Sequence, residues 1–233
     1  MSKPRFPFLR KASKPWAMTQ ITMIRHGQAN SHADNAEDYD RLSPLGEQQA
    51  RWLGAHMAHT GARFDHVICG DMRRHHGTAR GMGQNTFDID ARFDELDYFA
   101  LAKSAERHHG VPFNSEDNTF AENAPKIMAH WEADSLPDVP ERYASFQTRI
   151  LAGIEDACAR GGHHLIVTSG GVISLVLRYA MGLDVANFSK AMLPIRNSSI
   201  HSFEHLQGTF FLTGYNAIPH LDAPDRAHAR TFY

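Results

Sequence analysis

Residues 19–27, TQITMIRHG, join a short run of apolar and β-branched side chains to an arginine, a histidine and a glycine. The run Ile21–Ile24 predicts a buried strand. Two similar runs, Phe64–Cys69 and Leu165–Thr168, predict further strands, and each is followed by a sequence with helical spacing. Strands that alternate with helices are typical of a mostly parallel sheet covered on both faces. We therefore expect an α/β fold, a three-layer α/β/α sandwich.

Caps and periodicity predict the helices and the last two strands. Ser43 followed by Pro44 is a helix-start signal, and Gly161-Gly162 ends the strongest helical pattern of the chain. The expected elements are helices over 44–60, 73–82, 141–160 and 172–181, and a final hairpin that joins 198–203 to 209–215 through Gln207-Gly208.

Between about residues 94 and 140 this rhythm is lost, because turn-forming Asn, Asp and Pro are scattered among aromatic residues. We expect an insertion that covers the functional site. Ligands of open α/β sheets bind beyond the carboxyl ends of the strands. The loops that start at Arg25, Gly70 and Ser169 should therefore share one edge.

The 233 residues have the composition of a soluble globular protein, with 42% hydrophobic residues, 21% charged residues and a formal net charge of -2. No run of roughly 18 apolar residues predicts a membrane-spanning helix, and the charge gives no reason to expect nucleic acid or a membrane as a partner. Two cysteines fit a reducing compartment, which predicts a cytoplasmic protein. We expect a flexible basic arm over 1–17, one domain over 18–217 and a loose polar tail over 218–233.

Three further segments follow the first strand in a fixed order: Leu42–Ala50 (LSPLGEQQA), Met72-Arg73-Arg74 with Thr78-Ala79, and Phe93-Asp94-Glu95. Together with Arg25-His26-Gly27 they resemble the signature of the histidine phosphatase superfamily, the phosphoglycerate-mutase-like proteins, over about residues 19–217. The resemblance implies a phosphoglycerate-mutase-like fold. Asn30 stands one position earlier than the asparagine of the superfamily pattern, and we keep it as a candidate phosphate ligand.

The residues in these segments suit a phosphate monoester. Guanidinium groups match phosphate oxygens with paired hydrogen bonds, so Arg25 and Arg74 are the expected clamp. A neutral imidazole can attack phosphorus, which makes His26 the candidate nucleophile and a phosphohistidine the expected intermediate. Glu95 is the candidate acid for the leaving group and then the base for water. Two neighbouring carboxylates are alternatives to it: Asp94 and Asp97. The scheme calls for no metal and no cofactor.

The main departure from the resemblance lies after the third strand. The superfamily's second histidine belongs to a V-x-S-H-G-G pattern, but here Ser169 stands at the histidine position. A serine hydroxyl donates one hydrogen bond to phosphate and carries no charge, and the loss of one such donor costs on the order of a hundredfold or more. We expect Ser169 and the backbone of Gly170, at a helix start, to bind phosphate, with activity reduced or redirected.

Other histidine pairs are candidate substitutes for the missing histidine. His163-His164 should lie at the far end of their strand, some 15 Å or more away. His108-His109 would reach over the site from the insertion, and in a further alternative one of His75-His76 faces the site. Adjacent residues point in different directions, so we do not expect a metal site from these pairs.

The sequence thus predicts a phosphatase that hydrolyses a phosphate monoester through His26. Two alternatives stay open: a mutase acting on phosphoglycerates, and a phosphate-binding regulatory protein with weak or no turnover. The phosphatase is preferred because Leu96–Leu101 follows Glu95 where the cofactor-dependent mutases have R-H-Y-G-x-L, and because the insertion is acidic. The expected partner is a phosphorylated small molecule or a phosphoprotein, and its identity and the oligomeric state are open.

Overall fold

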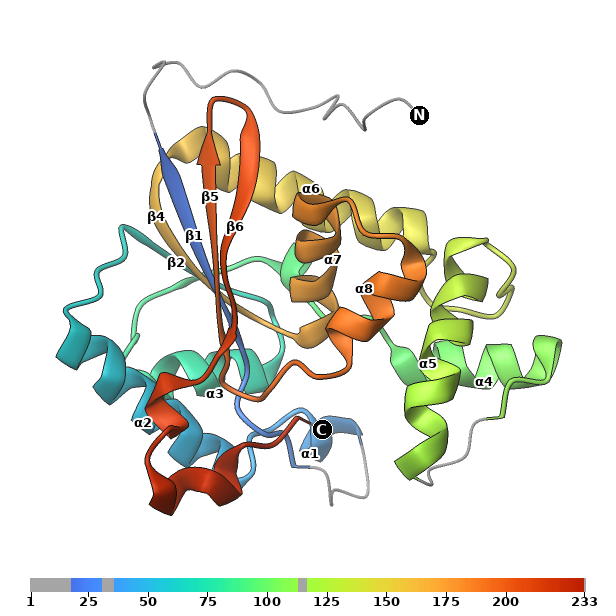
Figure 1. Ribbon diagram of the computed structural model, residues 1–233, viewed down its shortest axis with the longest axis horizontal. Coiled ribbons are helices and arrows are strands. Elements are labelled where there is room, and N and C mark those ends of the chain that lie inside the picture. The colour runs from blue at the N-terminus through green and yellow to red at the C-terminus, as the bar shows by residue number, and fades with distance from the viewer. Residues whose placement is uncertain (1–17, 31–35, 113–116, 233) are drawn as a thin grey trace.

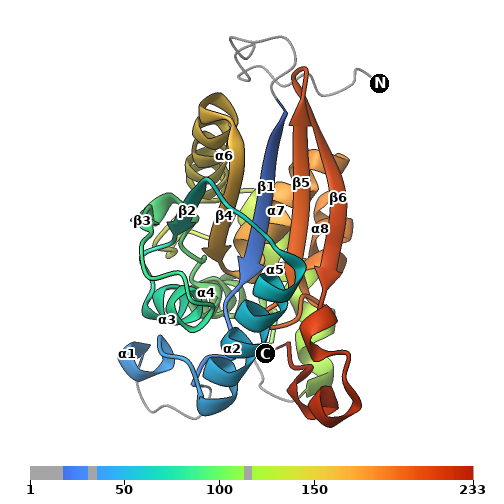
Figure 2. The same cartoon turned by 90° about the vertical axis from the view of Figure 1, so that its left-hand side faces the viewer.

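The computed structural model describes residues 18–30, 36–112 and 117–232. Within them one sheet has the strand order β3-β2-β4-β1-β5-β6 (Figures 1 and 2). The strands are β1 (Thr19–Arg25), β2 (His66–Cys69), β3 (Asp88–Ile89), β4 (Gly162–Thr168), β5 (Ile200–Leu206) and β6 (Thr209–Ala217). The first four strands run parallel to one another, whereas β5 is antiparallel to both β1 and β6. The sheet is therefore mostly parallel, as predicted.

Helices cover both faces of the sheet, which confirms the three-layer α/β/α arrangement. One face packs against α2 (Pro44–Thr60) and α3 (Arg73–Gly81), and the other against α6 (Tyr143–Arg160) and α7 (Gly170–Met181). Successive side chains of a strand point to opposite faces. In β1, Met23 accordingly belongs to the core under α6 and α7, and Ile24 to the core under α2 and α3.

The predicted helix starts and turns have the expected local geometry. The side chain of Ser43 caps α2 by accepting a hydrogen bond from the Gly46 N–H at 3.0 Å. Gly61 ends that helix with a φ of 70°, in the left-handed region that glycine adopts without strain. In the hairpin, Gln207 and Gly208 have φ values of 52° and 79°, the positive pair that matches the twist of the two strands.

The insertion is more regular than its sequence suggests. It forms α4 (Tyr98–His109) and α5 (Asp117–Glu132), and a further helix, α8 (Val185–Met192), packs against α5 and α7. Pro125 lies inside α5 and obscures its helical pattern. Leu101 and Trp131 are buried in the same core as α6, although both helices extend to one side of the sheet (Figure 1). The insertion is therefore part of the domain's packing.

The segment after β6 is packed, and the expectation of a loose tail is wrong for residues 218–232. It forms two short 3₁₀ turns, Pro219–Leu221 and Pro224–Ala229. The buried amide of Gln49 donates to the Ala229 carbonyl at 2.7 Å. The expected basic arm over 1–17 lies outside the described residues. In the described part of the chain, no helix has the length and apolar character needed to cross a membrane.

Candidate active site

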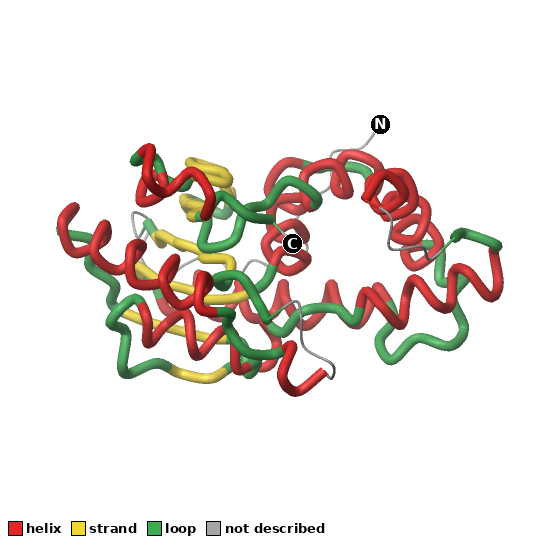
Figure 3. The backbone as a smooth tube through the Cα atoms, turned by 90° about the horizontal axis from the view of Figure 1, so that it is seen from below, coloured by secondary structure: helices red, strands yellow, loops and turns green. Residues whose placement is uncertain are grey.

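The three predicted loops meet at one edge of the sheet. Arg25 at the end of β1 pairs with Thr168 at the end of β4, and Cys69 at the end of β2 pairs with Val167. In Figure 2, β1 and β4 point toward the end of the molecule where α1 (Ala36–Tyr39) and α2 lie, and Figure 3 looks onto that end. Parallel pairing therefore brings together segments that are far apart in the sequence.

The loop after β1 is held by buried side chains of α2 and α3. The Gly27 N–H donates to Oγ1 of Thr78 at 3.0 Å, and the Gln28 N–H donates to Oε1 of Gln49 at 2.7 Å. A Cβ at Gly27 would lie 2.4 Å from the carbonyl oxygen of Gly46, so the loop and α2 approach at a distance that only glycine permits. The backbone on either side of His26 is therefore fixed.

These contacts hold His26 in one protonation state. Its Nδ1 lies 2.7 Å from the Gly27 carbonyl oxygen, which only accepts, so Nδ1 carries the proton. Nε2 lies 3.2 Å from Nε of Arg74, which only donates, so Nε2 offers its lone pair. Burial lowers the pKa of His26 well below its usual range, and the charges of Arg74 and Arg25 lower it further. These contacts and the lowered pKa favour the neutral imidazole, with its lone pair on Nε2.

Arg74 reaches His26 from the first turn of α3. Its side chain is buried, and its Nη1 donates to Oδ1 of Asp40 at 2.7 Å. Oδ2 of Asp40 accepts from the Arg73 N–H at 2.9 Å, so one carboxylate orients both the guanidinium and the helix start. No motif in the sequence predicts that Asp40 orients Arg74. Its loop follows residues 31–35, which lie outside the described part of the chain.

Arg25 lies at this edge with other partners. Its Nη1 donates to the carbonyl of Ile195 and, at 2.7 Å, to the carbonyl of Phe232. Its Nε is buried and has no hydrogen-bond partner in the described part of the chain. Burial lowers its pKa, whereas the charge of Glu95 raises it. Of the two arginines of the predicted clamp, Arg74 thus bonds to His26, and Arg25 is tied to the C-terminal segment.

Glu95 is held at the start of α7. Its Oε2 accepts from the Gly171 N–H at 3.0 Å, and its Oε1 accepts from the Leu96 N–H at 3.1 Å. A carboxylate is favoured at a helix N-terminus because the helix dipole is positive there. The carboxylate therefore has a defined place between α7 and the charge of Arg25.

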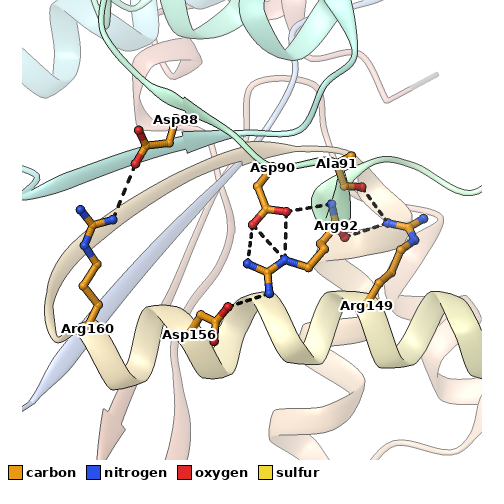
Figure 4. A network of polar contacts seen from close by, with 7 residues as sticks. All are labelled: Asp88, Asp90, Ala91, Arg92, Arg149, Asp156 and Arg160. Carbon is orange, nitrogen blue, oxygen red and sulfur yellow. Dashed lines mark hydrogen bonds and ion pairs between the residues drawn. The ribbon is translucent and has the colours of Figure 1, made fainter.

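A network of ion pairs attaches the segment before Glu95 to α6 (Figure 4). Nη1 of Arg149 donates to the carbonyls of Arg92 and Asp94 at 2.7 and 2.8 Å. Arg92 bridges Asp90 and Asp156, each at 2.7 Å. These contacts hold the backbone before Glu95 against α6.

The family follows from these arrangements together with a sequence match. A neutral histidine after β1, a buried arginine on α3 and a carboxylate at the start of α7 converge at one sheet edge. The sequence profile of the histidine phosphatase superfamily (branch 1) matches residues 21–218. The chain belongs to this superfamily.

Known members of the histidine phosphatase superfamily resemble the chain over most of its length. A probable phosphoglycerate mutase, GpmB, from Cronobacter sakazakii is 26% identical, with 89% of this chain and 97% of that protein covered. A mitochondrial serine/threonine-protein phosphatase, PGAM5, from Xenopus laevis is 28% identical over 58% of this chain and 42% of its own length.

Two solved structures share the fold. Phosphoglycerate mutase from Bacillus anthracis superposes with a TM-score of 0.64 at 18% identity, over 88% of this chain and 96% of that one. A phosphoserine phosphatase from Entamoeba histolytica, solved with phosphoserine, superposes with a TM-score of 0.62 at 20% identity, over 87% and 99%. The phosphoglycerate-mutase-like fold is therefore confirmed, and phosphatases and mutases are both among the chain's neighbours.

Ser169 has an unexpected partner in this superfamily member. Its Oγ lies 2.7 Å from Nε2 of His75, and both side chains are fully buried. The imidazole of His75 lies beside that of His26, with 5.7 Å between the ring centroids. The sequence alone offers His75 and His76 as one alternative among several. The signal for His75 is that it replaces the superfamily's usual small residue in the same chain in which Ser169 replaces a histidine.

The remaining candidates lie as follows. Asp97 caps α4 by accepting from the Ala100 N–H at 3.0 Å. Asp94 accepts from the Asp71 N–H at 2.6 Å, and burial raises its pKa. The Asn30 N–H donates to the Arg41 carbonyl at 2.9 Å, and the phosphate role of Asn30 stays a prediction, as does that of Gly170.

The other histidine pairs contact groups outside this edge. His108 lies 2.9 Å from Oδ2 of Asp138, and His109 lies 2.8 Å from the Ser135 carbonyl oxygen. His163 pairs with Gln20 near the opposite end of β1. Among the residues that the structure describes, no three His, Cys, Asp or Glu side chains are grouped to hold a metal ion.

Proposed function

We propose that this protein hydrolyses phosphate monoesters through a phosphohistidine at Nε2 of His26. One observation carries the proposal: the Gly27 carbonyl and the guanidinium of Arg74 select the neutral tautomer with its lone pair on Nε2. A buried neutral imidazole beside a fixed cation suits attack on an anionic phosphorus, because the cation stabilises the charge of the transferred group.

Two displacements complete the reaction. In the first, Nε2 of His26 forms a bond to phosphorus, the bond to the ester oxygen breaks, and the carboxylic acid of Glu95 gives its proton to the departing oxygen. In the second, the Glu95 carboxylate takes a proton from water, whose oxygen bonds to phosphorus as the P–N bond breaks. Inorganic phosphate and neutral His26 are released. Arg74, with Arg25 as a second positive charge, balances the phosphoryl oxygens.

The first test is hydrolysis of p-nitrophenyl phosphate from pH 4 to 8 by the natural protein and His26→Ala. His205→Ala is the matched control, because His205 is also buried but pairs with Thr19 at the far end of the sheet. We expect His26→Ala to lose activity and His205→Ala to keep it. Rapid quenching with ³²P-labelled substrate should trap an acid-labile, alkali-stable phosphoprotein. Equal activity of the natural protein and His26→Ala would refute the mechanism.

The role of Glu95 is tested by changing the leaving group. p-Nitrophenolate departs without a proton, whereas an alkoxide needs one, so Glu95→Gln should slow an alkyl phosphate far more than p-nitrophenyl phosphate. Asp94→Asn is the control carboxylate. If Asp94→Asn shows the leaving-group dependence and Glu95→Gln does not, then Asp94 is the acid.

Phosphatase activity is preferred over mutase activity because a mutase must also hold a second anionic group, which calls for several basic residues near the site, and the insertion is acidic. Incubation with 3-phosphoglycerate and its bisphosphate cofactor should release inorganic phosphate and give no isomer. Formation of 2-phosphoglycerate would favour the mutase instead.

A further inference from the structure

His75 and Ser169 form a buried polar pair that the proposed chemistry does not yet use. They are 94 residues apart in the sequence, and their side chains meet at 2.7 Å with neither exposed to solvent. His75 follows Arg74 on α3, and Ser169 stands between β4 and α7. The ring of His75 is tilted by 38° against that of His26. The ring that the proposed reaction phosphorylates, that of His26, is therefore a direct neighbour of this pair.

The place of the imidazole is built into the backbone. A Cβ at Gly70 would lie 2.4 Å from Nδ1 of His75, so the ring occupies room that only glycine leaves free. Ser169 is also unusual as the N-cap of α7, because its side chain makes no capping hydrogen bond. Serine at this position ordinarily accepts from a helix N–H. Here its hydroxyl bonds to His75 instead.

The pair has two hydrogen-bonded forms, because a hydroxyl both donates and accepts. If Ser169 donates to Nε2, its proton is unavailable to a ligand. If Nε2 of His75 carries the proton and donates to Oγ, the hydroxyl proton is free to bond to a phosphoryl oxygen. A phosphoryl oxygen beside Ser169 would accept the hydroxyl proton and so favour the second form.

Charged and titratable groups around His75 affect which of the two hydrogen-bonded forms is favoured. His26 faces it from the β1 loop, Arg74 and His76 flank it on α3, and Asp94 approaches the same side of Gly70. Burial and the charge of Arg74 lower the pKa of His75 well below its usual range. Burial and Arg74 therefore favour the neutral imidazole, and a phosphate dianion would oppose that effect because it attracts a proton to the ring.

We propose that Ser169 binds the transferred phosphoryl group and that His75 is its positioning residue, holding the hydroxyl in the donating form and supplying positive charge in the transition state. This inference rests on the proposed phosphatase reaction at His26. His75 on α3 then supplies the imidazole that is missing between β4 and α7, where Ser169 stands. It also explains why Ser169 and His75 are both present in a chain that keeps the rest of the site.

The test compares Ser169→Ala, His75→Gln and the double variant with p-nitrophenyl phosphate as substrate. Glutamine places its amide near the position of Nε2 and keeps a hydrogen bond to Ser169, but it cannot carry a charge. We expect each single variant to lower kcat by about 10- to 100-fold with little change in KM, as for the loss of one oxyanion donor. The double variant should be little worse than either single variant, because the two residues act as one unit. His76→Gln is the control on the same helix, since His76 packs on Phe87.

A variant in which the imidazole is moved from position 75 to position 169 distinguishes a role in catalysis from a purely structural effect. In His75→Ala/Ser169→His the imidazole approaches the same space from the other side, so kcat should recover at least about tenfold over His75→Ala. Ser169→His alone should not gain activity, because His75 already fills the space beside it. Wild-type kcat in His75→Gln, or multiplicative losses in the double variant, would overturn the inference. Because His26→Ala is measured beside these variants, failure of the phosphatase mechanism is recognised separately.

Discussion

Gly171→Ala should displace the Glu95 carboxylate while lowering the stability of the fold only slightly. A Cβ on Gly171 would lie 2.3 Å from Oε1 of Glu95 and 2.7 Å from Cδ2 of Leu96. Both separations are well inside contact distance, and Leu96 is buried in the core. The backbone there is anchored, so we expect the carboxylate to give way. The Gly171 N–H then loses its acceptor.

The expected sizes of the two effects differ. A displacement of about 1 Å from the productive geometry costs roughly a hundredfold in rate. The lost hydrogen bond to a charged group costs about 1.5–3 kcal/mol, and the better helix propensity of alanine returns about 1 kcal/mol. The free energy of unfolding should therefore fall by no more than about 2 kcal/mol while kcat/KM falls about a hundredfold.

Gly170→Ala controls for the glycine replacement itself. Its Cβ would first meet Nε of Arg25 at 3.7 Å, an ordinary contact, and its backbone N–H is kept. We expect a loss of less than about tenfold. The assay is kcat/KM with an alkyl phosphate, with urea denaturation of both variants. If Gly171→Ala retains full activity, or if both variants lose the same amount, then the hydrogen-bonded place of Glu95 does not matter for catalysis.

Three further predictions concern the scaffold. Thr78→Val keeps the shape but leaves the buried Gly27 N–H without an acceptor, so urea denaturation should show a loss of about 1–3 kcal/mol, and an unchanged midpoint would contradict it. Gln49→Met removes a buried amide that joins α2 to the His26 loop and to the C-terminal segment. Limited proteolysis should therefore cut the C-terminal segment faster than in the natural protein. Equal cleavage rates would show that Gln49 does not hold this segment. Burial lowers the pKa of His201 to about 3 and that of His220 to about 4. The unfolded chain therefore binds more protons than the folded chain below about pH 6.5, so the free energy of unfolding falls as the pH drops below that value. The expected loss at pH 4.5 is about 2–3 kcal/mol per histidine. A flat profile of unfolding free energy from pH 7.5 to 4.5 would contradict this.

The parts of the site that the sequence predicts best are those in which a motif residue makes a backbone contact. Gly27 and Gly46 approach each other closely, and Thr78 and Gln49 bond to backbone N–H groups of the His26 loop. Such contacts tolerate few side chains, so their spacing is visible as a pattern. The same reasoning accounts for the strands and for the helix that starts after Ser43, where local caps and periodicity are sufficient.

Elements stabilised by tertiary packing were harder to predict. The helix α5 contains Pro125 and many polar residues, and Trp131 becomes a core residue only when α6 is beside it. In the segment after β6, Leu221 and Ala229 are buried, and the Ala229 carbonyl accepts from the buried side chain of Gln49. Nothing in its local sequence indicates those partners.

The largest differences between the predicted and observed site concern pairs that are distant in the sequence. Arg25 contacts the carbonyl of Phe232 from 207 residues away, and Ser169 contacts His75 from 94 residues away. Each residue alone has an ordinary interpretation, as a clamp or as a phosphate donor. Only the folded chain shows that their hydrogen-bonding groups are already partly occupied.

The charged groups of the site differ in how the fold compensates them. A buried cation is costly unless it is paired. Arg74 has Asp40 at 2.7 Å, whereas Nε of Arg25 is buried without a hydrogen-bond partner among the described residues, and His75 is held neutral. The carboxylate whose charge acts on Arg25 is that of Glu95. In the proposed reaction a doubly charged phosphate supplies the further negative charge that a protonated His75 needs, which the singly charged Glu95 does not. We therefore expect the protein to bind a phosphate dianion more tightly than a monoanion.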